Sequence, residues 1–423
     1  MPVISRFFAL PSQALRHWGL LACVGLGFGL NTSALAQSDE PPLALALSPS
    51  LSLKGFGTLG LARSDSSTSG TGFVRDLSQP SGVKNKWSGL IDSLIGLQAN
   101  YRFNSSTEAV VQGVSHYRYD SSFTPDLTTA YISHDISPRL TFRAGRLATE
   151  FLIQANSRMI GYSYLPVRPA SDFYAGVPIN YADGADAQLR WPVGEGVFRF
   201  GFLAGLAREK LPFYDVNNAK VLQATVGFDQ GPWQFRGIYV HGRLSNEVEG
   251  IAPLRLMLQG VGAQNVANDL SVVNKPTHYA SLGVSYDDGS WQFQANLNSI
   301  RHQNVLFENS RSGYVQLGHR FGSVSPFIGY SRTLSSPKSL STGLPDLYFG
   351  QLNAGVQQAL RSNHADQYTT TVGARWDFRR NMDLKAQLDM VRADPNSRSI
   401  FHNPDPSWNG RVNVLSVAMD FIF

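Results

Sequence analysis

The chain has 423 residues, of which 43% are hydrophobic, 11% aromatic and 16% charged, and its formal net charge is +5. This charge is too weak to predict a nucleic-acid partner. After residue 36 there is no apolar run of about 18 residues, which excludes a transmembrane helix in the rest of the chain.

Residues 1–36 have the three parts of a secretory signal peptide. Arg6 and Arg16 supply positive charge, 19–30 is a short apolar core, and 34–36 (Ala-Leu-Ala) fits the small-x-small cleavage rule. A retained membrane anchor fits less well because the apolar core is too short to span a bilayer. A lipoprotein site at Cys23 also fits poorly, because apolar sequence continues beyond it. The mature chain then has no cysteine and no thiolate chemistry.

After a short periplasmic segment at 37–50, apolar and polar residues alternate through 51–423. In 382–390 the even positions are apolar and the odd positions are Asp383, Lys385, Gln387 and Asp389. Such alternation predicts strands with one face in lipid and one in a polar lumen. Sixteen segments follow the pattern: 51–62, 90–103, 107–119, 127–135, 139–146, 183–192, 196–207, 219–228, 233–241, 277–286, 291–301, 312–321, 324–332, 367–378, 382–392 and 410–423.

The connections between these segments alternate between short turns and longer loops. The short turns are rich in Gly, Pro, Asn, Asp and Ser. The longer loops lie near 63–89, 120–126, 147–182, 208–218, 242–276, 302–311, 333–366 and 393–409. This arrangement predicts an all-β, antiparallel transmembrane barrel of about sixteen strands, with the short turns in the periplasm and the loops outside the cell.

Aromatic residues gather at the ends of the predicted strands, as in the interfacial girdles of membrane barrels. The girdle candidates are Tyr101, Phe103, Tyr117, Tyr119, Trp191, Trp233, Trp291, Trp376 and Phe378.

Four segments carry a resemblance to a known family. Residues 413–423 resemble the final strand of Gram-negative outer-membrane porins, 143–146 the end of their fifth strand, 183–190 the start of their sixth, and 382–388 their penultimate strand. The resemblance implies a sixteen-stranded porin with its third loop folded into the lumen, located in the bacterial outer membrane as a homotrimer. It also implies that Phe423, with Phe421, is the signal for the barrel-assembly machinery. The surroundings would be outer-membrane lipid and lipopolysaccharide.

Two features depart from that family pattern. The second loop is only about 120–126, so the latch that this loop makes onto a neighbouring subunit in trimeric porins is in doubt. The third loop, 147–181, lacks the acidic tip of general porins, but it is long and rich in aromatic and apolar residues, which favours packing against the barrel wall.

Strand alternation places ten basic and four acidic side chains on the inner face. The basic ones are Lys54, Arg102, Arg118, Arg143, Arg190, Arg199, Arg236, Arg320, Arg375 and Lys385, and the acidic ones are Glu108, Asp186, Asp377 and Asp389. We hypothesise a constriction in which a basic wall faces acidic groups of the third loop and favours anions or carboxylates. The wall residues are Arg143, Arg146, Arg190, Arg199 and Arg236, and the loop residues are Glu150, Arg158, Arg168 and Asp172. For any one arginine the alternative is an ion pair between strands, away from the constriction.

The sequence has no catalytic, cofactor or metal motif. The predicted function is therefore a porin for passive diffusion of small hydrophilic solutes, and not an enzyme. The alternatives are a barrel that transports lipid or small molecules and an outer-membrane enzyme such as a phospholipase. Outward serines such as Ser115 and Ser133 have no evident His partner for such an enzyme.

Overall fold

The computed structural model describes residues 45–423 except 67–71, 150–156, 175, 177–178, 213, 399 and 403–406. The predicted signal peptide and most of the segment 37–50 lie outside the described residues. The end of that segment forms a short strand, β1 (Leu45–Ser48), which pairs with β2.

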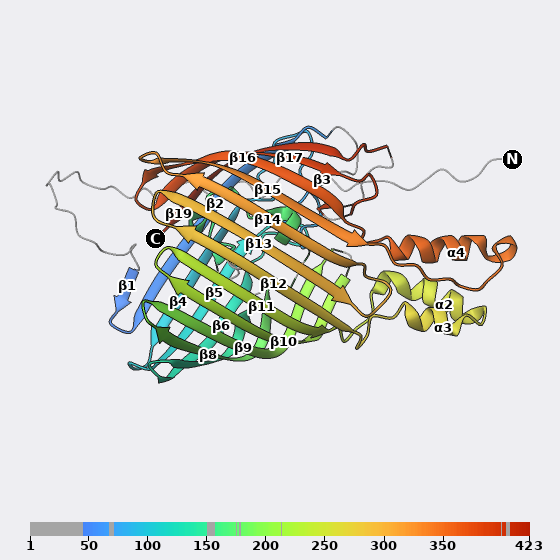
Figure 1. The fold of residues 1–423 in the computed structure, drawn as a ribbon, viewed down its shortest axis with the longest axis horizontal. Helices are drawn as coiled ribbons and strands as arrows, with labels where there is room; N and C mark the ends of the chain where they lie inside the picture. Colours follow the sequence, from blue (N-terminus) through green and yellow to red (C-terminus); the bar gives the residue numbers. More distant parts are fainter. Residues whose placement is uncertain are drawn as a thin grey trace, which may run out of the picture. The chain divides into compact units, whose positions relative to one another are not determined.

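Within the described residues, the main sheet has seventeen strands, of which all but β1 close into a sixteen-stranded antiparallel barrel (Figure 1). The barrel closes where β19 pairs with β2. Its strands are β2 (Leu51–Ser64), β4 (Leu94–Arg102), β5 (Thr107–His116), β6 (Asp126–Ser137), β7 (Leu140–Ala148), β8 (Tyr181–Val193), β9 (Gly196–Leu211), β10 (Tyr214–Gln230), β11 (Trp233–Arg243), β12 (Pro276–Asp287), β13 (Trp291–His302), β14 (Asn309–His319), β15 (Val324–Ser336), β16 (Asp366–Arg379), β17 (Met382–Ala393) and β19 (Arg411–Ile422). The prediction of a sixteen-stranded barrel is confirmed.

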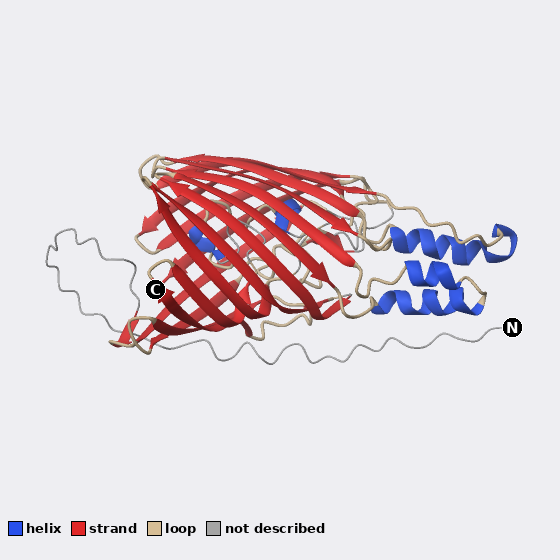
Figure 2. Ribbon diagram, turned by 60° about the horizontal axis from the view of Figure 1, so that its bottom comes forward, coloured by secondary structure: helices blue, strands red, loops and turns tan. Residues whose placement is uncertain are grey.

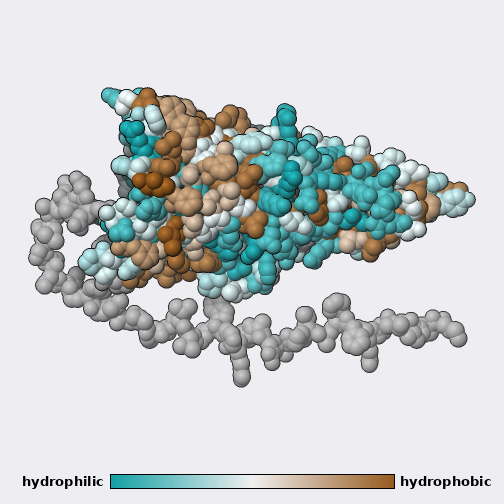
Figure 3. All heavy atoms as spheres, turned by 90° about the horizontal axis from the view of Figure 1, so that it is seen from below, coloured by the Kyte–Doolittle hydropathy of each residue, from teal (hydrophilic) through white to brown (hydrophobic). Residues whose placement is uncertain are grey.

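The predicted alternation separates an apolar outer face from a polar inner face. Between β12 and β13, Leu282 lies opposite Leu297, and these side chains are 70% and 67% exposed. The adjacent pair, Ser281 and Asn298, is buried inside. Figure 3 shows hydrophobic surface across one part of the barrel and hydrophilic surface between it and the tip that carries the helices. The described helices include none long and apolar enough to cross a membrane.

The predicted aromatic girdle is mostly on the outside. Trp191, Trp233, Trp291 and Trp376 are all between 41% and 49% exposed. Tyr117 is an exception, because it is only 5% exposed and its hydroxyl lies 2.8 Å from the Ser81 hydroxyl of the first loop. The ring therefore holds a loop and does not face lipid.

The loop prediction between β9 and β10 is wrong. The sequence places a loop at 208–218, but β9 continues to Leu211 and β10 begins at Tyr214. The apolar inward positions Leu211, Tyr214 and Val216 extend this hairpin, because they join the buried cluster inside the barrel.

The long connections 242–276 and 333–366, which the sequence predicts as loops, contain helices. The first holds η3 (Glu249–Ile251), α2 (Ala252–Gly260) and α3 (Gln264–Asp269), and the second holds α4 (Asp346–Leu360). Leu258 of α2, Leu270 and Val356 of α4 are fully buried in one apolar cluster. The two loops therefore fold together at one end of the barrel (Figure 2). We call this the loop end and the opposite one, with the short turns, the turn end.

The first and last loops also meet, through β3 (Gly72–Phe73) and β18 (Phe401–His402). The third loop contains η2 (Gly161–Ser163) and α1 (Ser171–Tyr174). Both lie within the ring of strands in Figure 2 and not at its end. This loop brings charged and aromatic side chains into the lumen.

The seam between β19 and β2 shows what the last phenylalanines contact. The backbone N–H of Phe423 donates to the carbonyl of Gly55 (2.9 Å), and the Gly55 N–H donates back (2.8 Å). The ring of Phe423 lies over Gly55 and that of Phe421 over Gly57, so closely that a Cβ at either glycine would collide with it. Aromatic rings that cover glycines stabilise strand pairing. Recognition of these residues by the assembly machinery stays a prediction.

We predict that Gly55→Ala lowers the unfolding free energy by about 1–3 kcal/mol, the usual cost of overpacking, because the new methyl group displaces the Phe423 ring. Guanidinium unfolding of the refolded barrel measures this change. Gly242→Ala, in β11 with no atom closer than 3.9 Å to its Cβ, is the matched control and is expected to be nearly neutral. Equal effects of the two substitutions would contradict the role given to the Phe423 ring.

Candidate pore constriction

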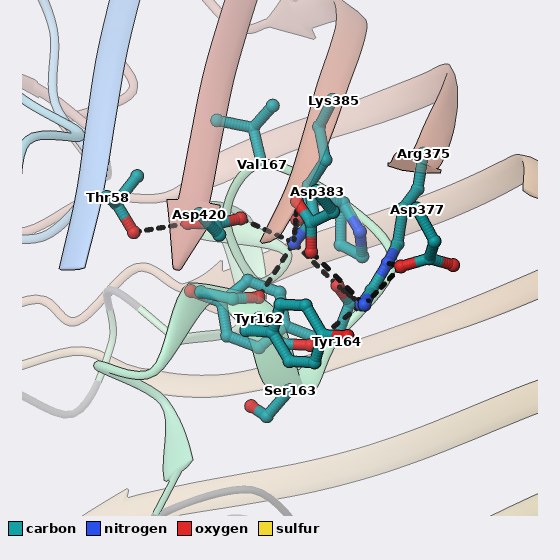
Figure 4. A network of polar contacts seen from close by, with 12 residues as sticks. Thr58, Tyr162, Ser163, Tyr164, Val167, Arg375, Asp377, Asp383, Lys385 and Asp420 are labelled. Atoms are coloured by element: carbon teal, nitrogen blue, oxygen red, sulfur yellow. Dashed lines mark hydrogen bonds and ion pairs between the residues drawn. The ribbon is translucent and has the colours of Figure 1, made fainter. Parts of the chain in front are cut away.

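Lys385, on the inner face of β17, is the centre of the contacts that hold the third loop. Its side chain is completely buried, and its ammonium donates to the carbonyls of Gly161 (2.7 Å), Tyr164 (2.7 Å) and Pro166 (3.2 Å). It also forms an ion pair with Asp420 of β19 at 2.8 Å (Figure 4). A buried ammonium needs several acceptors to replace its water. Three of them are loop carbonyls, so the loop completes the site of this lysine.

Arg375 and the small size of Gly161 also determine how this turn of the loop lies against the wall. Arg375 of β16 donates to the Tyr162 carbonyl (2.7 Å) and pairs with Asp383 (3.1 Å) and Asp377 (2.8 Å). Figure 4 shows Arg375 and Lys385 reaching the η2 turn from neighbouring strands. A Cβ at Gly161 would collide with Asp420. Only glycine fits here, since the loop backbone lies directly on the wall.

Arg168 of the loop is paired, and its guanidinium is fully buried. Its side chain donates to Asp92 (2.9 and 2.7 Å) and to Asp389 of β17 (2.6 Å). Although burial disfavours the cation, the two carboxylates raise its pKa above the ordinary value. Arg168 therefore fastens the loop between β17 and the segment before β4, and is not open to a solute.

Asp172 and the aromatic residues after it carry the loop toward the other strands. The Asp172 carboxylate accepts hydrogen bonds from Ser331 of β15 (2.7 Å) and from Gln367 of β16. The ring of Phe173 lies 5.0 Å from that of Tyr314 on β14, with an edge-to-face orientation. Phe173 is fully buried, so α1 packs against the inner face of β14, β15 and β16.

Arg158, another of the predicted loop charges, lines a pocket between the loop and strands β5, β6 and β9. Its side chain forms no ion pair within 4 Å among the described residues. Glu150 lies outside the described residues. The loop therefore offers a basic group to the lumen where the sequence reading expected acidic ones.

The two predicted wall arginines of β7, Arg143 and Arg146, point to opposite faces of the sheet. Arg143 pairs with Asp186, whose register partner Leu203 belongs to the buried inner cluster. Arg146 pairs with Asp183 at 2.7 Å, and Asp183 is the register partner of Leu206, which is 39% exposed. Arg146 is therefore on the outer face of the sheet and does not contribute charge to the lumen wall.

The other three wall arginines gather near the turn end. Arg190 of β8 and Arg199 of β9 are register partners. Arg199 pairs with Asp229 of β10 at 2.6 Å, and Arg236 of β11 approaches the same carboxylate at 3.4 Å. Arg190 is exposed and has no ion pair within 4 Å among the described residues. The cluster has three cations for one anion.

The sequence count of inner charges missed several acids. Asp229, Asp383 and Asp420 all pair with inward arginines or Lys385, yet none was counted. Strand parity could have found them, because Asp383 and Lys385 are two residues apart and so share a face. The excess of ten basic over four acidic groups was therefore too large. No group of three His, Cys, Asp or Glu side chains among the described residues is arranged to hold a metal.

Comparison with known proteins gives matches in structure only. No family model and no curated protein matches the chain. The anion-selective porin from Comamonas acidovorans is similar at 12% sequence identity and a TM-score of 0.53, over 88% of this chain and 99% of that one. The chain has the fold of the outer-membrane porins. A closed barrel with this apolar outer surface belongs in the bacterial outer membrane.

Two other porin-fold structures show the same extent of likeness. OmpF of Salmonella typhi, in complex with daunomycin, has 12% identity and a TM-score of 0.52 over 88% of this chain and 97% of OmpF. The outer membrane channel DcaP of Acinetobacter baumannii has 11% identity and a TM-score of 0.52 over 90% of this chain and 100% of DcaP. At such identities the likeness concerns the fold alone.

We predict that Lys385→Met lowers the unfolding free energy by about 3–5 kcal/mol, because Asp420 then stays buried without its cation. Guanidinium unfolding measures the loss, and single-channel recordings are expected to become noisier as the loop loosens. Lys385→Met with Asp420→Asn is expected to recover part of the stability. Arg332→Gln, which breaks an ion pair with Asp366 that is 43% exposed on both sides, is the control with a loss below about 1 kcal/mol. Equal losses in Lys385→Met and Arg332→Gln would contradict the anchoring role.

A second prediction concerns pH. Burial raises the pKa of Asp172 to about 6, from an ordinary value of 3.8. Between these two pH values the folded state binds more protons than the unfolded state, so this group makes the barrel less stable as the pH rises from about 4 to about 6. The loss amounts to about 3 kcal/mol at most. The difference in unfolding free energy between wild type and Asp172→Asn is expected to change across this window and to be flat above pH 7. A difference that is flat from pH 4 to 6 would rule the shift out.

Proposed function

We propose that the protein is a porin that lets small hydrophilic solutes diffuse passively through the outer membrane, with a preference for anions and carboxylate-bearing solutes. The observation that carries the proposal is the third loop, which Lys385, Arg375 and Arg168 fasten to the inner face of β16 and β17. A sixteen-stranded barrel is wide enough for water, and a loop pinned inside narrows the lumen. The narrowest charged part of a channel sets its selectivity.

The charge of the turn end supports the preference for anions. Arg190, Arg199 and Arg236 face the single carboxylate of Asp229 there. Arg143 adds little, because Asp186 neutralises it. We propose Arg190, Arg199 and Arg236, with Arg158 of the loop, as the basic groups that a permeating solute meets. Arg168 and Asp172 act instead by holding the loop.

The proposal includes no enzymatic activity. One Ser, His and Glu group does lie together at the loop end, but its geometry favours a structural role. His364 Nδ1 is 2.9 Å from Glu308 and 3.3 Å from the Ser335 hydroxyl. A catalytic triad needs its serine and its carboxylate on opposite ring nitrogens. Here the Ser335 hydroxyl and the Glu308 carboxylate both contact Nδ1 of His364. These contacts join the sixth loop to the end of the seventh loop.

We further propose that the protein is exported to the periplasm with loss of residues 1–36, assembled by the barrel-assembly machinery and surrounded by lipid and lipopolysaccharide. We also propose a homotrimer, as the porin fold suggests. Chemical crosslinking of the protein in native outer membranes tests the trimer.

Planar-bilayer recording tests the channel. The wild-type protein is expected to give stepwise conductance and a reversal potential that indicates anion preference under a salt gradient. Asp229→Asn removes the one carboxylate among three arginines and is expected to raise the anion-to-cation permeability ratio, whereas Arg236→Gln lowers it. Glu249→Gln, on the exposed start of the helices, is the matched control and leaves the ratio unchanged. Cation preference in the wild type would refute the anion proposal, and absence of any conductance would refute the porin.

A further inference from the structure

A pocket inside the loop end of the barrel is lined by charges of both signs. It lies between the third loop and strands β5, β6 and β9. Arg158 comes from the loop, Arg118 from the residues after β5 and Lys210 from β9. The acidic lining residues are Asp126, the first residue of β6, and Glu209 of β9.

These five groups lie beyond ion-pair distance of one another. None of them forms an ion pair within 4 Å in the described part of the chain, although opposite charges share the pocket. Arg118 donates to the Thr124 carbonyl (3.2 Å), and the Lys210 ammonium lies 5.5 Å from the centre of the Tyr119 ring. Glu209 accepts one hydrogen bond, from the Asn180 amide (3.1 Å). Separated charges of both signs remain accessible to a solute that carries both.

Arg158 is held in place through its backbone. Its carbonyl accepts hydrogen bonds from Arg75 (3.0 Å) and from the Tyr164 hydroxyl (3.2 Å), and both of these residues are buried. Its guanidinium donates no hydrogen bond in the described part of the chain. The loop backbone therefore positions a guanidinium that has no hydrogen-bond acceptor among the described residues, and such a group can bind a carboxylate.

The opposite wall of the pocket offers acceptors. Besides Asp126 and Glu209, the carbonyl oxygen of the Asn180 side chain is buried and has no hydrogen-bond donor. A buried acceptor left unsatisfied is costly, and a ligand can provide the missing donor. An ammonium group has three N–H donors, which matches two carboxylates and one amide oxygen.

We propose that this pocket binds amino acids, with the carboxylate of the solute on Arg158 and its ammonium group between Asp126, Glu209 and Asn180. The inference rests on the proposed porin function and adds a substrate class to it. In this binding mode the loop supplies the cation and the wall supplies the carboxylates, although Arg118 and Lys210 also line the pocket. The sequence predicted the opposite polarity, with acidic groups on the loop. A monocarboxylate can use Arg158 but leaves Asp126, Glu209 and the Asn180 oxygen without a donor. A primary amine leaves Arg158 without an acceptor.

The test compares three solutes of similar size in planar bilayers: glutamine as the zwitterion, a monocarboxylate and a primary amine. Binding is read as a concentration-dependent block of the ion current. The wild-type channel is expected to bind glutamine more tightly than either singly charged solute. Arg158→Gln and Glu209→Gln are each expected to weaken glutamine binding about fivefold, as loss of one partly exposed charge contact does. Arg361→Gln and Glu249→Gln, exposed residues on the helical part, are the matched charge controls.

The outcomes separate this inference from the porin function. A conducting channel that binds glutamine no better than the monocarboxylate overturns the amino-acid site and leaves the porin intact. The same holds if Glu209→Gln leaves glutamine binding unchanged, or if the amine alone binds best. A protein that inserts and gives no conductance at all contradicts the porin itself. Both site variants keep the contacts of Lys385, so we expect them to fold. Circular dichroism spectra and unfolding curves like those of the wild type would show this.

Discussion

The position of the third loop in the lumen depends above all on Lys385. Lys385 is completely shielded from water, and its side-chain nitrogen contacts Asp420 and three carbonyl groups of the third loop. A strand side chain alone could not satisfy this ammonium, and the loop backbone alone would leave its carbonyls without donors. Each therefore needs the other, and this mutual need fixes the loop on the wall. Arg168 repeats the arrangement with the cation on the loop and the carboxylates on the surrounding wall.

Anchoring on β16 and β17 has a consequence for the rest of the lumen. The charges used to hold the loop are neutralised among themselves, so they contribute little to the field that a solute meets. The groups left open are on the other side of the loop, around Arg158 and Glu209, and at the turn end, around Arg190 and Asp229. The lumen therefore has two charged regions in series, one of mixed sign and one mainly basic.

The strands could be predicted from the sequence because lipid imposes a rule on every second residue. The boundaries of β17 and β19 were nearly correct, and so was the inward direction of Lys385. What Lys385 binds could not be predicted, because its acceptors are backbone carbonyls more than 200 residues away. Every residue has a backbone carbonyl, so the sequence does not mark which ones accept. Arg146 was a different kind of error. It is three residues from Arg143, so the same alternation puts the two side chains on opposite faces.

The helices at the loop end could not be predicted from the alternation of apolar and polar residues, because that alternation is the pattern of strands. Residues 252–260 and 346–360 are connections in a strand-by-strand reading, and only their contact with each other buries Leu258 and Val356. Neither loop could keep that cluster dry alone. The packing of the two connections is therefore interdependent: a change of length or packing in one has to be accommodated by the other, although four strands separate them in the chain.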